Sequence, residues 1–571
     1  MKRIILYVFT LLTPLFSVAQ EYASPLGIDL LLSSNFGELR TNHFHSGLDF
    51  KTGGVEGENV YSVESGYVSR IFVSPTGYGH ALYIAHPSKG TTTVYGHLRN
   101  FSPEIEEYVR KYQYRNKKFS VDIYPEKTVF PVEKGQKIAE SGNTGSSGGP
   151  HLHFEIRNSS NEPINVVKDE MFMVKNSAKM VKDEEKPGIH SVSFVRIDTV
   201  KGVPIHTTYK KFNAKKVGGK YKLSYDTIRV EAPSYFVIEV SERKTASTNI
   251  YGIYSMKIER SGKPYFSFAI DKFSFTDTRY VNTLLKFPET DENRNDKIRT
   301  YVSPNNNLKI YGTVASRGVI KPQTIDGVEP VFVEICDDSG NKSQLEFSIY
   351  AQEKPNAKVL SDKGTPVWWK KGATIKEGDV SVEIPAYALY ESELVDITVL
   401  PKVEGTVIER YVVGNKDVKL QKSYTLAFDI SSVDESDRSK LKIVSMKSGK
   451  VSYSAGGTVS GDKITLKTTN FGEYSLAIDK TAPTITPQYK SQESQAAKSH
   501  LSFKISDNLS GINTYNAIIN GKWALLEFDS KTATIRHPLK DGIAQKGANT
   551  IEVTVTDASN NKKTYSGTFL Y

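Results

Sequence analysis

The sequence has 571 residues, of which 24% are charged, and its formal net charge is +10 at pH 7. This length is too great for one hydrophobic core and indicates roughly three to five domains. The positive charge is thinly spread, without a dense Lys/Arg block, which argues against nucleic acid as a partner, and the single cysteine excludes internal disulfides.

The first residues have the pattern of a cleaved signal peptide. A basic start precedes an apolar run over 4–16 and small residues at 17–19. The run is too short to span a bilayer comfortably, so we expect residues 1–19 to be removed on export. No later segment is long and apolar enough to cross a membrane, so we expect a protein without a membrane span.

The remainder of the chain is typical of strands and turns. Short runs of Val, Ile, Tyr, Phe and Thr are broken by Gly, Asn and Asp, which predicts a predominantly all-β fold. A weak repeat relates residues 333–350 to residues 553–571, as expected for two copies of one β-sandwich module. The predicted domains are 20–180 with an insertion at 99–129, an immunoglobulin-like sandwich at 186–352 with an insertion at 273–304, a β-sandwich at 353–478, and an immunoglobulin-like sandwich at 479–571.

Two short segments place metal-ligand residue types on common strand faces. His45 and Asp49 are an even number of residues apart, so their side chains leave the same face of an extended segment. His151 and His153 share a face for the same reason. If the two strands are neighbours, these groups converge, and two imidazoles with one carboxylate form the ligand set of a catalytic zinc site. Spacing alone leaves open which of the two later histidines is the ligand.

These segments belong to a longer series of motifs in a fixed order. The series contains Phe44-His45-Ser46-Gly47-Leu48-Asp49, Gly77-Tyr78-Gly79, Tyr95-Gly96-His97-Leu98 and Gly149-Pro150-His151-Leu152-His153. Over residues 35–167 the chain resembles the M23 peptidases, the lysostaphin/LytM-like zinc endopeptidases. The resemblance implies an antiparallel β-sheet peptidase domain with Zn²⁺ held by His45, Asp49 and His153, and it implies that His97 and His151 are catalytic.

The resemblance also implies a reaction and a substrate. Zinc polarises the scissile carbonyl and lowers the pKa of a bound water toward about 7. The two catalytic histidines then move the proton and stabilise the oxyanion, and which does which stays open. The implied substrate is the peptide part of bacterial peptidoglycan, cut in the periplasm or at the cell surface, with an envelope partner on the sandwich domains. The expected substrate-binding residues are Arg40, Asn42, Tyr95 and Asn143.

Three other functions are alternatives to peptidoglycan hydrolysis. A catalytically inactive wall-binding or hydrolase-activating scaffold would have lost ligands, whereas all five His/Asp positions are intact. An adhesin built from the sandwiches is favoured only by their length. A protease of Gly-rich proteins would use the same chemistry and stays open.

The insertion at 99–129 departs from the family pattern, which has a short loop there. It contains a predicted helix with Ser102 as N-cap, Pro103 at the first helical position, and apolar periodicity up to about Gln113. A long loop near an active site is commonly functional. We therefore expect the insertion to wall one side of the groove or to occlude it.

Overall fold

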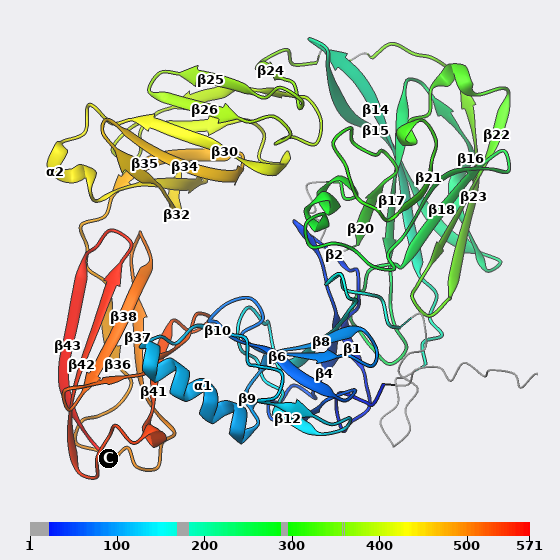
Figure 1. Cartoon of the computed structure of the whole chain (residues 1–571). Helices are drawn as coiled ribbons and strands as arrows, with labels where there is room; N and C mark the ends of the chain where they lie inside the picture. Colours follow the sequence, from blue (N-terminus) through cyan, green and yellow to red (C-terminus); the bar gives the residue numbers. More distant parts are fainter. Residues whose placement is uncertain (1–21, 168–181, 287–294, 357, 359) are drawn as a thin grey trace, which may run out of the picture.

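The computed structural model describes residues 22–167, 182–286, 295–356, 358 and 360–571. The signal peptide expected at 1–19 lies outside them. Strands dominate throughout, which confirms the predicted fold class. Figure 1 shows four bodies, which we name the N-terminal domain (22–167, blue), the first module (188–351, green), the second module (365–478, yellow) and the third module (484–571, orange to red). None of the helices in the described part of the chain is long and apolar enough to cross a membrane.

The N-terminal domain is built on one antiparallel sheet with the motif strands at its centre. The strand that carries His151 and His153 pairs on one side with the strand of Asp49 and on the other with the strand of His97. The sheet order is β1 (Leu32–Ser34), β4 (Leu48–Lys51), β13 (His151–Arg157), β8 (Thr91–Leu98), β7 (His80–His86), β6 (Gly66–Val73) and β10 (Val121–Ile123), with β11 (Pro131–Val132) also on β6. Smaller sheets join β5 (Asn59–Tyr61), β12 (Lys137–Glu140) and β9 (Asn100–Phe101), and β2 (Leu39–Arg40) with β3 (His43–Phe44).

The predicted helix in the insertion is present as α1 (Pro103–Asn116). Ser102 is the N-cap residue but its side chain makes no capping bond; instead the Glu106 carboxylate accepts the Phe101 amide at 3.2 Å. The helix runs three residues beyond Gln113 and ends where Lys117 adopts a left-handed conformation. In Figure 1 α1 lies between the main sheet and the third module.

The first module is one long sheet of ten strands. The parallel pair of β16 and β23 lies in the middle of the sheet and joins its two halves. The order is β20 (Asp296–Arg299), β17 (Ser234–Ser241), β14 (Gly188–Val200), β15 (Val203–Val217), β16 (Lys220–Val230), β23 (Lys342–Ala351), β22 (Val328–Cys336), β18 (Ser255–Arg260), β19 (Lys263–Ala269) and β21 (Tyr311–Val314).

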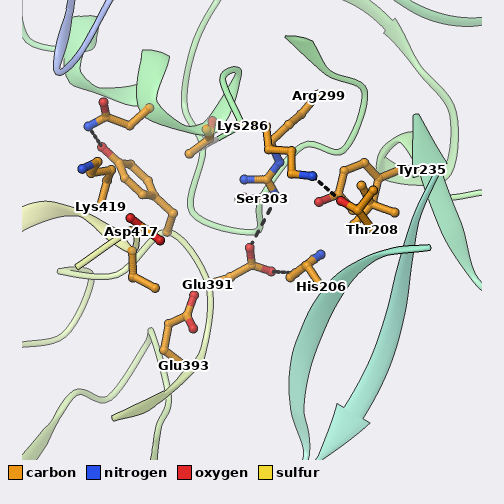
Figure 2. Close-up of a pocket in the computed structure, with 15 residues that line it drawn as sticks. His206, Thr208, Tyr235, Lys286, Arg299, Ser303, Glu391, Glu393, Asp417 and Lys419 are labelled. Atoms are coloured by element: carbon orange, nitrogen blue, oxygen red, sulfur yellow. Dashed lines mark hydrogen bonds and ion pairs between the residues drawn. The ribbon is translucent and has the colours of Figure 1, made fainter. Parts of the chain in front are cut away.

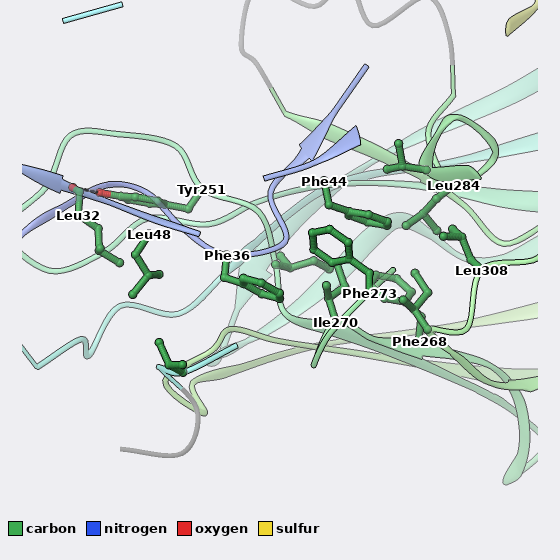
Figure 3. Packing of buried hydrophobic residues seen from close by; sticks show 14 of the residues in the cluster. Leu32, Phe36, Phe44, Leu48, Tyr251, Phe268, Ile270, Phe273, Leu284 and Leu308 are labelled. Carbon is green, nitrogen blue, oxygen red and sulfur yellow. Dashed lines mark hydrogen bonds between the residues drawn. The ribbon is translucent and has the colours of Figure 1, made fainter. Parts of the chain in front are cut away.

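The first module and the N-terminal domain share one hydrophobic core, whereas the sequence suggested separate cores. Part of the insertion expected at 273–304 makes this contact. The Phe273 ring lies 5.4 Å from the ring of Phe36 and 5.0 Å from that of Phe44, between the two domains (Figure 3). The short helix η1 (Thr278–Thr283) follows, and its Thr278 hydroxyl accepts the Phe44 amide.

The second module consists mainly of two five-stranded sheets around its own core. Buried polar groups join it to the first module: the Glu391 carboxylate accepts a bond from His206 and lies 3.7 Å from Arg299 (Figure 2). It also accepts a bond from Tyr301. The sheets are β25 (Ala373–Glu377), β26 (Val380–Ile384), β30 (Lys419–Asp429), β34 (Lys463–Asn470) and β33 (Thr458–Ser460), and β28 (Ile397–Leu400), β29 (Arg410–Val413), β35 (Gly472–Ile478), β31 (Leu441–Lys447) and β32 (Lys450–Gly456).

The third module folds back onto the N-terminal domain (Figure 1). Several of its docking contacts fall on α1: Tyr114 donates to Asp541 at 2.6 Å and packs edge-on against Trp523. Its two four-stranded sheets are β36 (Thr484–Pro487), β37 (His500–Ser506), β41 (Thr534–Pro538) and β40 (Glu527–Asp529), and β39 (Lys522–Ala524), β38 (Ile512–Ile519), β42 (Ala548–Asp557) and β43 (Lys562–Leu570). The domain limits and the immunoglobulin-like character given in the sequence analysis stay predictions.

Candidate metal centre and active site

The structure brings the three expected metal ligands together. The Nε2 atom of His45 lies 3.1 Å from Asp49 Oδ1 and 3.2 Å from His153 Nδ1, and the last two atoms are 2.8 Å apart. Ligands about 2.0–2.1 Å from one tetrahedral zinc ion would be separated by about 3.3 Å, so the triangle is close to that size. All three side chains are buried. Two imidazoles and a carboxylate therefore fit a zinc ion with one position left for water.

Both ligand histidines are oriented through their second ring nitrogen. His45 donates from Nδ1 to the carbonyl of Asn35 at 2.7 Å, which leaves Nε2 for the metal. His153 donates from Nε2 to Glu155 Oε1 at 2.9 Å, which leaves Nδ1 for the metal. Such partners fix the tautomer and the ring direction of a metal-binding histidine. The two ligand histidines therefore present opposite ring nitrogens to the same point.

Glu155 is the centre of a buried hydrogen-bond network behind His153. Its Oε1 also accepts from Ser46 and from Tyr78, each at 2.6 Å, and its Oε2 accepts from Arg157 at 2.6 Å. Burial opposes ionisation, but the bonds from His153 and the charge of Arg157 outweigh it and lower the pKa of Glu155 to about 2. Glu155 is therefore a carboxylate at neutral pH and holds the His153 ring in place.

The two expected catalytic histidines lie beside the triangle but are not needed as ligands. Their ring centroids are 4.8 Å apart, and His151 Nε2 lies 3.5 Å from Asp49 Oδ1. The Nδ1 atom of His97 lies 2.9 Å from the Thr144 carbonyl, and that of His151 lies 2.8 Å from the Gly149 carbonyl. With Nδ1–H donating to these carbonyls, the Nε2 atom of each ring keeps a lone pair that can accept a proton.

His97 reaches the site because its backbone is unusual. On β8 it follows Gly96, which is paired with His153, so regular alternation would turn it to the opposite face. Its φ of +58° and the adjacent register shift between β7 and β8 change its direction instead. Burial, followed by repulsion from His153 and His151, lowers the pKa of His97 to about 3, so its imidazole is uncharged at neutral pH.

Two glycines of the motifs allow close approaches that shape the site. A Cβ on Gly145 would lie 2.3 Å from the Gly79 amide, so the loop that carries the Thr144 carbonyl packs directly on the Gly77–Gly79 turn. A Cβ on Gly47 would lie 2.3 Å from the Phe154 carbonyl. The glycines therefore hold β13 and the 144–145 loop close to the ligands.

Two neighbouring cavities form a groove beside the expected metal ligands, one next to Asp49 and the other next to His151. One cavity of about 580 Å³ is lined by Asp49 and Arg40 and, across the groove, by residues 248–252 of the first module. A second cavity of about 370 Å³ is lined by His151, Gly148–Pro150 and Lys51, and Ser33 borders both. An extended chain lying along this path would pass Asp49 and His151, and the first module would form one wall.

Of the four expected substrate-binding residues, only Arg40 lines this groove. Its guanidinium pairs with Glu38 at 2.8 Å and lies 3.8 Å from Asp49. Tyr95 is fully buried and its hydroxyl accepts the Val63 amide at 3.0 Å, so the prediction that it binds substrate was wrong. Asn42 does not line the groove cavities; its amide group and backbone bond to Asn282 of the first module.

Asn143 lies on the side of the 144–145 loop that faces the third module. Its carbonyl accepts from Lys531 of the third module, and together they line a cavity of about 940 Å³ between that module and the N-terminal domain. Its side-chain oxygen is buried without a partner. Asn143 is thus placed toward the third module and not in the groove.

Asn35 and Glu155 support the metal centre although neither is among the residues predicted from the sequence. For Glu155 a signal existed, because it is two residues from His153 and therefore on the same strand face. For Asn35 none existed, because its carbonyl is a backbone group. Its side chain is held by the first module: Asn35 donates to the Gly252 carbonyl at 2.8 Å and accepts the Gly252 amide at 3.1 Å.

Comparison with known families and structures gives matches over two parts of the chain. Residues 43–114 and 119–166 match Peptidase family M23, and residues 365–479 match the Zu5-like domain. The break at 115–118 falls in the insertion. The sequence model of family M23 thus covers every expected metal ligand and catalytic histidine.

Solved structures with a likeness to the chain include three peptidases. The catalytic domain of a prophage-encoded M23 protein from Enterococcus faecalis is 21% identical, with 25% of this chain and 94% of that chain covered and a TM-score of 0.19. The catalytic domain of the antimicrobial peptidase lysostaphin from Staphylococcus simulans is 22% identical, with 23% and 86% covered and a TM-score of 0.17. A zinc-containing peptidase from Vibrio cholerae is 27% identical, with 28% and 41% covered and a TM-score of 0.19. With the family match and the His-Asp-His centre, the N-terminal domain is a member of peptidase family M23, a family of metallopeptidases.

Proposed function

We propose that the protein is an exported zinc endopeptidase that hydrolyses peptide cross-links of bacterial peptidoglycan. The observation that carries this proposal is the pair of histidines, His97 and His151, that lie beside the ligand triangle with Nε2 free. A structural metal site requires only its ligands and no neighbouring groups that transfer protons. An endopeptidase needs both, since one proton must be removed from water and one delivered to the leaving amine.

The residues divide the reaction among themselves. A zinc ion held by His45, Asp49 and His153 would supply a Lewis acid and lower the pKa of a water molecule. With zinc bound, Nε2 of His97 or His151 would accept a proton from the attacking water, and the other ring, when it carries a proton on Nε2, would donate toward the oxyanion or the leaving nitrogen. Burial of the site strengthens each of these interactions. The groove beside Arg40 and Asp49 takes an extended peptide past the reacting point.

The test uses the full-length protein with its zinc content measured. Cross-linked peptidoglycan is incubated with the protein, and new amino termini are identified by mass spectrometry. We expect new termini that disappear with a chelator, and a fall of about 10²–10⁴-fold in rate for His151→Ala with zinc retained. The matched control is His43→Ala, because His43 is exposed and bonds only to Thr41.

Two outcomes would reject the proposal. Binding of peptidoglycan with no new termini, by protein that holds zinc, would identify an inactive wall-binding or hydrolase-activating scaffold. New termini in a Gly-rich protein substrate and none in peptidoglycan would identify a protease with a different substrate.

A further inference from the structure

Two groups of three carboxylates lie apart from the metal centre, one at the leading end of the first module and one at that of the third. In each group, one oxygen from every residue lies within 4.8 Å of the others. Within the described part of the chain, these are the two such groups made of carboxylates alone. The first consists of Asp183, Glu242 and Asp337, and the second of Asp479, Asp507 and Asp557.

The group in the first module is built around the turn between β22 and β23. Asp337 Oδ1 accepts the amides of Ser339 and Asn341, at 2.9 and 2.8 Å. The Asn341 side chain then donates to the Asp183 carbonyl at 3.1 Å, which holds the leading segment against the turn. Glu242 completes the group from the residue after β17.

The third module repeats this construction bond for bond. Asp557 Oδ1 accepts the amides of Ser559 and Asn561, both at 2.8 Å, and the Asn561 side chain donates to the Asp479 carbonyl at 2.9 Å. Asp507 comes from the residue after β37, as Glu242 does after β17. The same three positions are therefore acidic in both copies of the repeat.

Neither group is satisfied by the protein alone. Glu242 is completely buried and neither of its carboxylate oxygens has a hydrogen-bond partner. Burial, and then repulsion from Asp337, raise the pKa of Glu242 to about 9. In the third module Asp507 Oδ1 is likewise buried without a partner. An unpaired buried carboxylate oxygen is costly, and each group contains at least one such oxygen.

In both groups the carboxyl groups outnumber the nearby cations. No ion pair joins Asp479, Asp507 or Asp557 to a Lys or Arg among the residues that the structure describes, and Lys442 is the lysine whose charge acts on Asp479 and Asp557. In the first module Lys244 pairs with Asp183 at 3.2 Å and with Asp338 at 2.5 Å. Four carboxyl groups thus surround one ammonium group.

We propose that each group binds one Ca²⁺ ion. Calcium takes six to eight oxygen ligands at 2.3–2.6 Å, so two oxygens on opposite sides of the ion are at most about 5 Å apart. Carboxylate oxygens within 4.8 Å of one another fit that sphere. Nitrogen ligands suit zinc and oxygen ligands suit calcium, so these sites are chemically distinct from the His45–Asp49–His153 centre.

The ions would fasten the joints between domains. Asp479 follows directly after β35, the last strand of the second module. Lys440 of the second module donates to the Ser559 carbonyl at 2.7 Å and to the Asn561 side chain at 2.8 Å. A cation on Asp479, Asp507 and Asp557 therefore ties the linker to the turn that already contacts the neighbouring module.

The experiment titrates CaCl₂ into the full-length protein by calorimetry after chelation and after one equivalent of zinc has refilled the histidine centre. We expect two equivalents of calcium and a rise in melting temperature. Glu242→Gln and Asp507→Asn should each remove one equivalent, and the double variant both. Neither substitution removes a hydrogen-bond acceptor that the fold uses, since the side-chain oxygen that Asp507→Asn retains can still accept the loop amides that bond to Asp507 Oδ2.

The control is Glu552→Gln, an exposed position on β42, which should keep both equivalents. Without calcium the two test variants should melt at or above the wild-type temperature, because repulsion is removed, and with calcium below it. A wild-type protein that is folded by circular dichroism and takes up no calcium would overturn the proposal. So would calcium uptake that is unchanged in the double variant. Neither readout depends on peptidase activity, so failure here is distinguishable from failure of the proposed function.

Discussion

At the residue scale, each imidazole of the metal centre depends on a partner that is not itself a ligand. Asn35, Glu155, Thr144 and Gly149 each accept one ring N–H, and together they decide which nitrogen of each ring faces the reacting point. Three of these acceptors are backbone carbonyls. The geometry of the site therefore depends on loop positions as much as on side-chain identity.

Glu155→Gln tests this dependence on a side-chain partner. We expect zinc affinity to fall by about 10–100-fold, because the neutral amide holds the His153 ring less firmly and the Arg157 charge loses its partner. Zinc dissociation constants measured by competition with a chromophoric chelator give the result. Glu133→Gln, at an exposed position of the same domain, should leave the affinity unchanged. Equal affinity in wild type and Glu155→Gln would contradict the role given to Glu155.

Tyr95→Phe tests the structural position of Tyr95 against the substrate-binding role expected from the sequence. The change removes the acceptor of the buried Val63 amide, so we expect the free energy of unfolding to fall by about 1–3 kcal/mol. Urea denaturation measures this loss. KM for a wall peptide should stay the same. A raised KM with unchanged stability would instead support the substrate-binding role of Tyr95.

At the element scale, the strands of the site followed from the sequence because they depend on local pattern. Side-chain parity places His45 with Asp49 and His151 with His153, and the pairing of β13 with β4 brings the two pairs together. Helix α1 followed from its capping residues and periodicity for the same reason. Contacts between domains carry no such pattern, so neither the support of Asn35 by Gly252 nor the burial of Phe273 was predictable.

Parity also failed where the backbone is irregular. His97 faces the site only because of its left-handed conformation, which no periodicity argument contains, and the family resemblance alone supplied it. Tyr95 illustrates the converse. It precedes His97 closely in sequence, but regular alternation on β8 sends its side chain into the core. Nearness to a motif is thus weaker evidence than the face of the strand.

Phe273→Ala tests whether the N-terminal domain and the first module form one cooperative unit. The ring fills the contact between the two domains, so we expect a loss of about 3–5 kcal/mol. Hydrogen exchange should show faster opening in β4 and β19 together. Val217→Ala at an exposed position should have little effect. Destabilisation confined to the first module would show that the shared core does not couple the domains.

At the whole-molecule scale, the third module returns to the domain that begins the described chain. It docks on α1 of the insertion, and its Lys531 bonds to the carbonyl of Asn143, beside the Thr144 carbonyl that orients His97. The insertion therefore serves as a platform between the active site and the third module. The expectation that the insertion walls or occludes the groove stays a prediction, because the residues lining the groove cavities include none of α1 or the third module.

Arg110→Ala tests the docking. Arg110 pairs with Glu527 at 3.2 Å and lies 3.8 Å from Asp541, so its loss removes from both partly buried carboxylates the cation that the N-terminal domain supplies. We expect the docked state to be destabilised by up to about 3–5 kcal/mol. The radius of gyration from small-angle X-ray scattering should rise. Lys111→Ala, whose partner Glu107 is exposed, is the matched control on the same helix and should leave the radius unchanged.

Acid should open the same contact without a mutation. Burial opposes ionisation of Glu527, but its bond with His500 and the charge of Arg110 outweigh burial and lower the pKa of Glu527 from 4.5 to about 2. His500 belongs to the same module as Glu527, so only the part of the lowering that Arg110 causes depends on docking. That part stabilises docking fully above pH 4.5 and is lost as the pH falls toward 2. We therefore expect the radius of gyration of the wild-type protein to increase within that window.

Glu527→Gln should show the larger radius already at pH 7 and a weaker response to acid. If Glu527→Gln instead has the wild-type radius at pH 7 and the wild-type acid response, the third module is held by other contacts, and the Tyr114–Asp541 bond and the Trp523 packing become the groups to remove.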